Sequence, residues 1–243
     1  MSGWRPSACS CAWPVAGMAV AGSDAEVAPM DRPGPVALFG GTFDPIHIGH
    51  LRAAWEVSEL LDCEVRLLPS GQPPHRAAPG RSAADRAAMI ELALAGQDRL
   101  CLDRRELERS GPSYSVDTLR ELREELGPDR PLLFMLGADA FRALPTWHRW
   151  RELTGLAHLV AMTRPRQRLD KLDPALHEAM LGRWTGVVER LRGEPAGRVM
   201  VVRVTPLSIS SSLIRQSLAQ GHMPRYLLPQ PVLDYILERG LYR

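Results

Sequence analysis

Short apolar runs alternate with longer amphipathic stretches along most of the chain. Residues 36–39 (Val-Ala-Leu-Phe) form an apolar run that ends at a glycine pair, and residues 49–61 follow with spacing compatible with a helix. An apolar run, a glycine turn and a helix in this order indicate a buried strand followed by a helix. The pattern recurs, with strands expected at 64–68, 131–136, 157–162 and 200–204 and helices at 82–95, 210–219 and 232–238. This alternation predicts an α/β fold with a parallel sheet flanked by helices, and a small helical portion at the C-terminus.

The beginning of the chain does not follow this pattern. Its apolar residues are interrupted by Pro14 and Gly17, so the segment is too short and broken to span a bilayer. A secretory signal is the alternative, because Arg5 precedes a mildly apolar run, but the same interruptions weaken the apolar region that such a signal needs. We expect residues 1–34 to be a disordered leader, or the product of an upstream start codon, and residues 35–243 to form the folded domain.

Composition excludes some partners and favours one compartment. Thirty basic and 28 acidic residues leave a formal charge of +2 over 243 residues, which gives no reason to expect a nucleic acid or an anionic membrane as partner. The four cysteines show neither metal-ligand spacing nor the density of a secreted disulfide scaffold. We therefore predict a cytoplasmic protein without a protein-held metal centre, in which any phosphate binding comes from local placement of residues.

Residues 40–50 (Gly-Gly-Thr-Phe-Asp-Pro-Ile-His-Ile-Gly-His) lie between the first strand and its helix. In open α/β sheets this junction binds ligands, and glycines and a helix N-terminus suit a phosphate there. His47 and His50 are three residues apart, so they share a face of the first helical turn and can stabilise developing charge. Two alternatives remain at this point: a metal site, for which no third His or Cys completes the ligand set, and a plain capping turn.

A second candidate phosphate site lies at residues 209–215 (Ile-Ser-Ser-Ser-Leu-Ile-Arg). Serine hydroxyls and open helix amides would form an anion pocket, and Arg215 could reach back to it as a charged fork. A serine-capped helix that carries an arginine is common, so these residues alone do not establish a site.

The two strings together resemble the motifs of the nucleotidyltransferase superfamily. Residues 47–50 match its H-x-G-H element, and residues 209–215 match I-S-S-T-x-I-R with Ser212 in place of threonine. The G-x-G-x-x-G and G-x-x-x-x-G-K-[ST] fingerprints of other nucleotide-binding proteins are absent from the sequence. The resemblance implies a single Rossmann-like domain. It also implies catalytic roles for His47, His50 and Arg215, and ATP binding by Gly40, Gly41, Thr42, Phe43, Ser210, Ser211 and Ser212.

Further segments resemble the bacterial nicotinate mononucleotide adenylyltransferase family. They are residues 73–76 (Pro-Pro-His-Arg), 111–119, 137–147 and the ending 228–243, so the resemblance extends over residues 36–243. It adds Arg76 to the ATP site and implies a mononucleotide site formed by Ser115, Val116, Asp139, Trp147 and His148.

The residue types in that second site fit a nicotinate ring and its ribose. Trp147 offers a flat face for stacking, the amides near Ser115, Val116 and His148 can meet a carboxylate, and Asp139 can accept from ribose hydroxyls. The sequence departs from the family twice. His148 stands where relatives often have tyrosine, which is tolerable if only its amide binds, and Ser115 replaces a commoner threonine but retains the hydroxyl.

The expected reaction joins the adenylyl group of ATP to nicotinate mononucleotide, which gives nicotinate adenine dinucleotide (deamido-NAD) and pyrophosphate in NAD biosynthesis. The attacking phosphate is already ionised, so positioning and charge neutralisation suffice, and Mg²⁺ would arrive with ATP. No nucleic acid or membrane partner is expected, and a homo-oligomer is one option for the assembly.

Two alternatives to this function remain open. An adenylyltransferase for phosphopantetheine or a cytidylyltransferase for a phosphoalcohol would share the histidine motif but would not require Trp147 or residues 111–119. A non-catalytic nucleotide sensor would have no need of His47, His50 and Arg215.

The expected leader leads to a first prediction. Deletion of residues 1–31 leaves the melting temperature and the activity nearly unchanged, because a segment so poor in periodic apolar residues has little to bury. Thermal unfolding of the full and shortened chains measures this, and a large fall in melting temperature would show that the segment packs on the domain.

Overall fold

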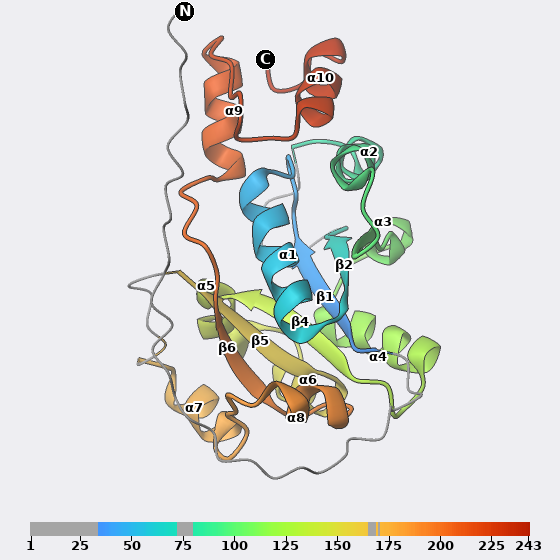
Figure 1. The fold of residues 1–243 in the computed structure, drawn as a ribbon, viewed down its shortest axis with the longest axis vertical. Coiled ribbons are helices and arrows are strands. Elements are labelled where there is room, and N and C mark those ends of the chain that lie inside the picture. The colour runs from blue at the N-terminus through green and yellow to red at the C-terminus, as the bar shows by residue number, and fades with distance from the viewer. Residues whose placement is uncertain (1–33, 72–79, 165–168, 170) are drawn as a thin grey trace, which may run out of the picture. The chain divides into compact units, whose positions relative to one another are not determined.

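The computed structural model describes residues 34–71, 80–164, 169 and 171–243, and its centre is a sheet of six parallel strands (Figure 1). The strands are β1 (Val36–Gly41), β2 (Glu64–Pro69), β3 (Leu100–Leu102), β4 (Leu132–Gly137), β5 (His158–Thr163) and β6 (Val199–Arg203). Their order across the sheet is β3-β2-β1-β4-β5-β6, so successive strands are added in one direction up to β3 and in the other direction from β4. This is the doubly wound, Rossmann-like order, in which ligands bind beyond the carboxyl ends of β1 and β4. The predicted fold class is confirmed.

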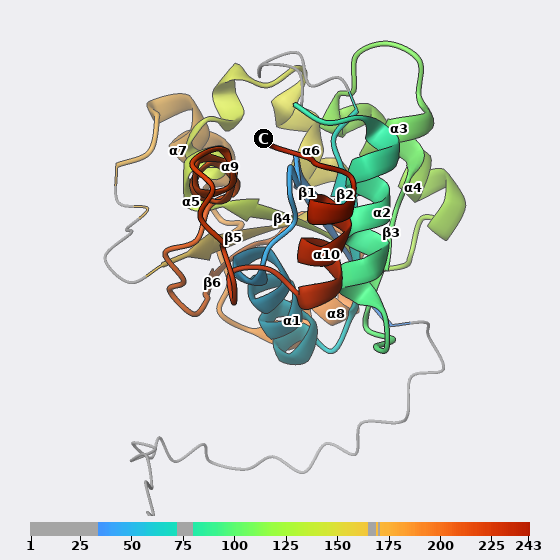
Figure 2. The ribbon, with the colours of Figure 1, turned by 90° about the horizontal axis from the view of Figure 1, so that it is seen from above.

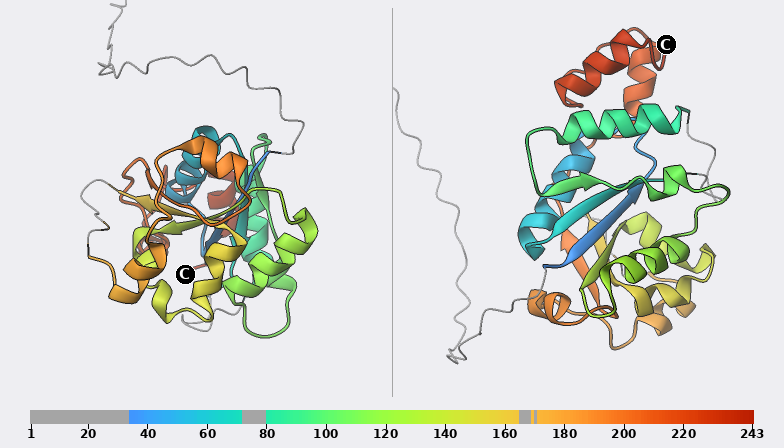
Figure 3. Two further views of the ribbon diagram at one scale, coloured as in Figure 1. Left: turned by 90° about the horizontal axis from the view of Figure 1, so that it is seen from below. Right: turned by 90° about the vertical axis from the view of Figure 1, so that its right-hand side faces the viewer.

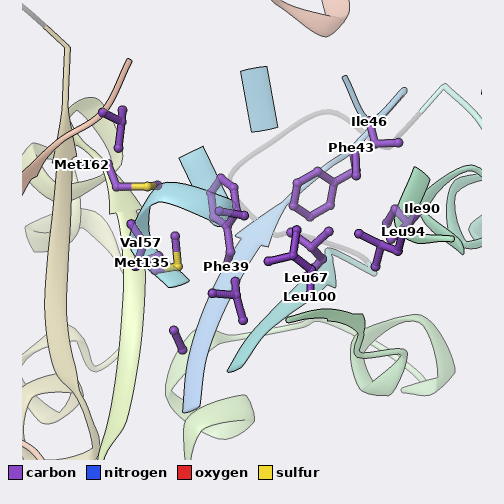
Figure 4. Packing of buried hydrophobic residues seen from close by; sticks show 14 of the residues in the cluster. Phe39, Phe43, Ile46, Val57, Leu67, Ile90, Leu94, Leu100, Met135 and Met162 are labelled. Atoms are coloured by element: carbon purple, nitrogen blue, oxygen red, sulfur yellow. The ribbon is translucent and has the colours of Figure 1, made fainter. Parts of the chain in front are cut away.

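Side chains from the two faces of the sheet enter two separate cores. In β1, Ala37 and Phe39 belong to one core and Val36 and Leu38 to the other, as the alternation of side chains along a strand requires. Figure 4 shows the first core around Phe39, where residues of several strands and helices meet. A parallel strand that is buried on both faces has a continuous apolar sequence, which explains the short apolar runs seen along the chain.

Helices from different parts of the chain complete each core (Figure 2). The first core receives residues of α1 (Ile48–Leu61), α2 (Ala83–Leu94), α8 (Val188–Gly193), α9 (Ser211–Ala219) and α10 (Gln230–Glu238). The second receives residues of α4 (Ser115–Leu126), α5 (Ala138–Arg142), α6 (Leu153–Leu156), α7 (Pro174–Met180) and the 3₁₀ turns η1 (Leu144–Thr146) and η2 (Trp150–Glu152). The short α3 (Arg105–Glu108) contacts β2. Figure 3 shows α10, in red, beside α2, against which it packs, and both predicted C-terminal helices, α9 and α10, are present.

Serine side chains explain where two predicted helices begin. Ser82 and Ser210 each precede the first helical residue, and their hydroxyl oxygens accept from the amides of Asp85 (3.1 Å) and Leu213 (3.2 Å). A side chain that caps a helix in this way replaces the missing intrahelical acceptor of a first-turn amide. The expected helices at 82–95 and 210–219 therefore start one residue later, at Ala83 and Ser211.

The short elements that were not expected from the sequence include β3, α7 and α8. β3 has only three residues, and α7 and α8 have seven and six, so none carries enough of a period to be recognised. No helix in the described part of the chain is long and apolar enough to cross a membrane. The expected leader lies almost entirely in residues 1–33, outside the described residues, and its boundary at residue 34 stays a prediction.

A buried histidine joins β5 to the segment before β6. The His158 side chain is fully buried; its Nδ1 accepts from the Arg198 amide (3.0 Å), and its Nε2 donates to the Glu194 carbonyl (2.8 Å). These two bonds require a neutral ring with its proton on Nε2. Burial is the main cause that lowers the pKa of His158.

We therefore predict that the protein loses stability in acid partly through His158. The unfolded chain takes up a proton on this ring below about pH 6.5, whereas the folded chain takes it up only at a lower pH, so the free energy of unfolding falls as the pH falls through that window. In denaturant titrations between pH 7.5 and 5, His158→Gln should show a shallower dependence on pH than the wild type. Substitution of the exposed His222 by Gln is the control and should keep the wild-type slope; equal slopes in all three proteins would contradict the prediction.

Candidate active site

The loop that leaves β1 turns sharply around a glycine. Phe43 adopts a left-handed backbone conformation (φ 49°), and its ring folds back on Gly41, where a Cβ would lie 2.8 Å from the nearest ring atom. The ring is held there by an edge-on contact with Phe39, at 5.7 Å between centroids (Figure 4). The next peptide bond, between Asp44 and Pro45, is cis. The close approach of the Phe43 ring therefore requires glycine at position 41. Because Gly41 has no side chain, the backbone at the end of β1 is also left uncovered.

The two histidines of the loop stack on each other at the start of α1. His47 is the N-cap residue, its Nδ1 accepts from the His50 amide (3.3 Å), and the two ring centroids lie 3.6 Å apart with 17° between the planes. A Cβ on Gly49 would lie 3.1 Å from two atoms of the His47 ring. The absence of a side chain at Gly49 therefore leaves room for the stacked pair.

Both rings are held in the neutral form. Burial lowers the pKa of His47 to about 4, with a further contribution from the positive charge of Arg164. Burial also lowers the pKa of His50 well below its usual value, with smaller contributions from His47 and Arg164. Because His47 Nδ1 is an acceptor, its proton is on Nε2, and that N–H is a donor. His50 Nδ1 is buried and has no hydrogen-bond partner in the described part of the chain, so a ligand could satisfy it.

A cavity of about 840 Å³ lies in front of this pair. It is lined by the residues predicted for ATP and catalysis, namely Gly40, Gly41, Thr42, Phe43, His47, His50, Ser210, Ser211, Ser212 and Arg215. Two motifs that are more than 150 residues apart in sequence thus face one space, as Ser211 and Pro45 illustrate with a separation of 166 residues. Arg76, which was also predicted to bind ATP, lies outside the described residues.

The start of α9 is fastened to the β1–α1 loop by its own polar groups. The Ser211 hydroxyl donates to the Pro45 carbonyl (2.9 Å). Arg215 donates from Nη1 to the Asp44 carbonyl (2.7 Å) and from Nη2 to the Ser212 hydroxyl (3.3 Å). The Ser211 hydroxyl hydrogen is therefore already bonded within the protein. The other guanidinium hydrogens of Arg215 take no part in these two bonds, and Arg215 borders the cavity.

A second cavity, of about 390 Å³, holds most of the predicted mononucleotide residues: Ser115, Asp139, Trp147 and His148 line it. Trp147 is partly buried and meets Phe134 edge-on, at 6.3 Å between centroids, and the His148 ring lies 4.4 Å from that of Tyr114. The carboxylate of Asp139 accepts from Arg142 (3.0 Å) and is otherwise largely exposed.

Val116 differs from the other residues of this set. Its side chain is fully buried in the second core, and it is not among the residues that line the cavity. Only its backbone amide is available for the predicted role. As the first two residues of α4, Ser115 and Val116 carry amides that have no intrahelical acceptor, and no bond to either is found within the described residues.

The two cavities share a wall. Gly40 and Gly41 at the end of β1, and Gly137, Asp139 and Ala140 at the end of β4, line both of them. The cavities therefore meet at the reversal of strand order, where a doubly wound sheet places its ligands.

Several residues of the site were not predicted from the sequence. Arg164 lines the larger cavity just after β5, and its position at the carboxyl end of a strand was a signal that could have revealed it. Arg86 is 2% exposed, and its Nη1 donates to the carbonyls of Thr42 (3.0 Å) and Ser70 (2.8 Å). Glu106, whose pKa is raised mainly by burial, lines the smaller cavity. A charged residue on an amphipathic helix gives no sign from one sequence that it is buried.

The comparisons with known proteins agree with this geometry. A family model described as Cytidylyltransferase-like matches residues 38–217. A probable nicotinate-nucleotide adenylyltransferase of Pseudomonas syringae pv. tomato is 48% identical over 212 residues, which cover 87% of this chain and 95% of that protein. A protein of the same name from Stenotrophomonas maltophilia is 46% identical and covers 84% of this chain and 95% of its own length.

A solved structure supports the fold at greater distance. The nicotinic acid mononucleotide adenylyltransferase of Plasmodium falciparum, in a complex with NaAD, is 19% identical, has a TM-score of 0.64 and covers 86% of this chain and 97% of its own. Nearly half of the residues are identical over almost the full length of the bacterial relatives, and this identity shows a common family as well as a common fold. The chain therefore belongs to the nicotinate-nucleotide adenylyltransferase family.

Proposed function

We propose that the protein transfers the adenylyl group of ATP to nicotinate mononucleotide, which yields nicotinate adenine dinucleotide and pyrophosphate in NAD biosynthesis. The observation that carries this proposal is the pair of cavities that meet at the carboxyl ends of β1 and β4. One is lined by a phosphate-binding loop and a helix start, and the other by an indole and open helix amides. The names of the bacterial relatives, and the P. falciparum protein complexed with NaAD, support the same reaction.

In this proposal the larger cavity holds the triphosphate of ATP. The backbone at Gly40, Gly41 and Thr42 approaches the phosphates, and Arg215 and the amides of α9 neutralise them from the opposite side. A mononucleotide phosphate oxygen forms a bond to the α-phosphorus, and the bond from this phosphorus to the oxygen bridging to the β-phosphate breaks in line. The electron pair of that bond leaves on pyrophosphate, so no general base is needed.

The histidines act on the charge that develops in this step. A neutral His47 offers its Nε2 proton, and His50 has a buried nitrogen without a partner. Donors placed before the reaction starts stabilise the transition state without a cost of reorganisation. An anionic triphosphate would also raise the low pKa of both rings, since an opposite charge favours the protonated form.

We also propose that Mg²⁺ takes part as a companion of ATP. The described residues contain no group of three or more His, Cys, Asp or Glu side chains that could hold a metal ion. An ion that is held by phosphate oxygens and water does not need such a group, and this is how Mg²⁺ usually enters sites of this kind. Bound there, the ion would neutralise charge on the leaving pyrophosphate.

The smaller cavity would take the mononucleotide. Trp147 would stack on the nicotinate ring, and the amides of Ser115 and Val116 would bind its carboxylate with the help of the α4 dipole. Asp139 borders both cavities and could accept from a ribose hydroxyl. The His148 side chain is exposed and adjoins Tyr114, so we assign only its amide to the site. Cytoplasmic location and a homo-oligomeric state stay predictions.

The substrate is tested by pyrophosphate release from ATP and magnesium with nicotinate mononucleotide, nicotinamide mononucleotide and phosphopantetheine. We expect nicotinate mononucleotide to be preferred over the nicotinamide form by up to roughly 10⁴-fold in kcat/KM. A carboxylate accepts hydrogen bonds from the helix amides, whereas the NH₂ group of nicotinamide would face these N–H donors with a donor of its own. Comparable values for the two mononucleotides would remove the specificity claim, and activity with phosphopantetheine alone would replace the proposed substrate. Trp147→Ala should raise the KM for the mononucleotide, whereas Trp184→Ala, which changes an indole outside both cavities, should not.

The role of the histidine pair is tested by His50→Ala. We expect kcat to fall by about 10²-fold or more, far more than the fold is destabilised, because the ring acts chiefly on the transition state. Single-variant kinetics and thermal unfolding measure both effects, with the exposed His222→Ala as control. Near-normal kcat in a folded His50→Ala protein would exclude His50 from the mechanism.

A further inference from the structure

Asp44 connects the phosphate-binding loop to three distant parts of the chain. It is 4% exposed, and its carboxylate accepts from the Gly80 amide at Oδ2 (2.8 Å) and from the Tyr242 hydroxyl at Oδ1 (2.5 Å). Its backbone carbonyl accepts from Arg215 (2.7 Å). The partners are 36, 198 and 171 residues away in sequence, so the conformation of this loop depends on segments that come from both ends of the domain.

Tyr242, the residue before the last, is held firmly where it meets Asp44. It is 6% exposed and has a left-handed backbone (φ 64°), which is uncommon for a residue other than glycine. The guanidinium of Arg81 lies over its ring, 4.7 Å from the centroid. Burial and the neighbouring carboxylate raise the pKa of its hydroxyl, which therefore stays protonated and donates to Asp44.

The position of Asp44 explains why this bond matters for a nucleotide. Asp44 lines the same cavity as His47 and Arg215, so its buried carboxylate adjoins a space whose other groups suit an anion. Its two oxygens are engaged by Gly80 and Tyr242, which fixes their direction. Without the tyrosine hydroxyl, one oxygen would lose its donor and could turn toward Arg215, where it would compete with the phosphates for the guanidinium.

We propose that Tyr242 is a positioning residue for ATP: through its hydroxyl it fixes the Asp44 carboxylate, and with it the phosphate-binding loop and Arg215. The C-terminal end of the chain is then part of the nucleotide site without touching the nucleotide. This proposal rests on the proposed function as far as it concerns turnover, but its effect on ATP binding can be measured without the second substrate.

The chain contains a matched control for this tyrosine. Tyr235 in α10 donates from its hydroxyl to Asp85 of α2 (2.9 Å), and the guanidinium of Arg239 lies over its ring at 4.9 Å. The same kind of bond and the same kind of cation contact therefore occur a few residues away. Asp85, however, lines neither of the two cavities. A structural contribution would appear as a loss of stability, larger at Tyr242 because its bond is buried, whereas a positioning role would appear as a loss of ATP binding at Tyr242 alone.

The experiment compares Tyr242→Phe with Tyr235→Phe in the full chain, by calorimetry with a non-hydrolysable ATP analogue and by kinetics with ATP and nicotinate mononucleotide. We expect Tyr242→Phe to weaken analogue binding about tenfold and to raise the KM for ATP by a similar factor, which is the scale of one hydrogen bond to a charged group. The KM for the mononucleotide should stay within about twofold of the wild type, and Tyr235→Phe should change none of these values by more than that. Thermal unfolding should show folded proteins in both cases, with the larger loss of stability in Tyr242→Phe because its bond to Asp44 is buried.

A double-mutant cycle with Asp44→Asn tests whether the tyrosine acts through this carboxylate. The effect of Tyr242→Phe on analogue binding should be largely lost when Asp44 is already changed, because coupled residues give non-additive effects. Equal analogue affinity in Tyr242→Phe and the wild type, equal losses in the two tyrosine variants, or full additivity with Asp44→Asn would each overturn the positioning role. Wild-type protein that binds the analogue but releases no pyrophosphate with the mononucleotide would instead overturn the proposed function and leave the binding test of Tyr242 intact.

Discussion

The close contact between two imidazoles and a backbone without a side chain governs the geometry of the site. His47 and His50 stack at 3.6 Å between centroids, and a Cβ on Gly49 would lie 3.1 Å from the first ring, which would then have to shift. Gly41 likewise has no side chain, and the Phe43 ring lies against its backbone. A side chain at either position would require an aromatic ring to move, by more at Gly41, where the Cβ would lie 2.8 Å from the Phe43 ring. The donors, the helix start and the cavity in front of them all follow from these two contacts.

The charged and hydrogen-bonding groups at this end of the sheet suit a negative charge that would come from a ligand and not from the protein. The histidines are kept neutral by burial and by Arg164, and Arg215 is anchored to the loop by one of its nitrogens. Asp44, the buried carboxylate nearby, has both oxygens engaged by donors from the protein. A polyphosphate that enters such a space finds positive and donor groups already directed toward it, so little reorganisation accompanies binding.

Features formed by contiguous residues could be predicted from the sequence, whereas contacts between residues far apart in the chain could not. The apolar run of β1, the glycine turn and the histidine spacing are contiguous, so the fold class and the position of the loop between β1 and α1 could be inferred from them. The bond between Tyr242 and Asp44 joins residues 198 positions apart, and the burial of Arg86 depends on carbonyls of two loops. Neither leaves a periodic or compositional trace in one sequence. Val116 was predicted to bind through its amide, and the burial of its side chain in the second core, which the sequence did not reveal, is compatible with that role.

The shared wall between the two cavities has a consequence for the end of the catalytic cycle. Gly40, Gly41, Gly137, Asp139 and Ala140 border both spaces, so under the proposed reaction the dinucleotide occupies at once the two places that its precursors occupied separately. Two ligands that have become one molecule bind more tightly than either alone, because the second half no longer has to be captured from solution. An enzyme built in this way works against its own product, and modest affinity in each half is the condition that lets the finished molecule depart.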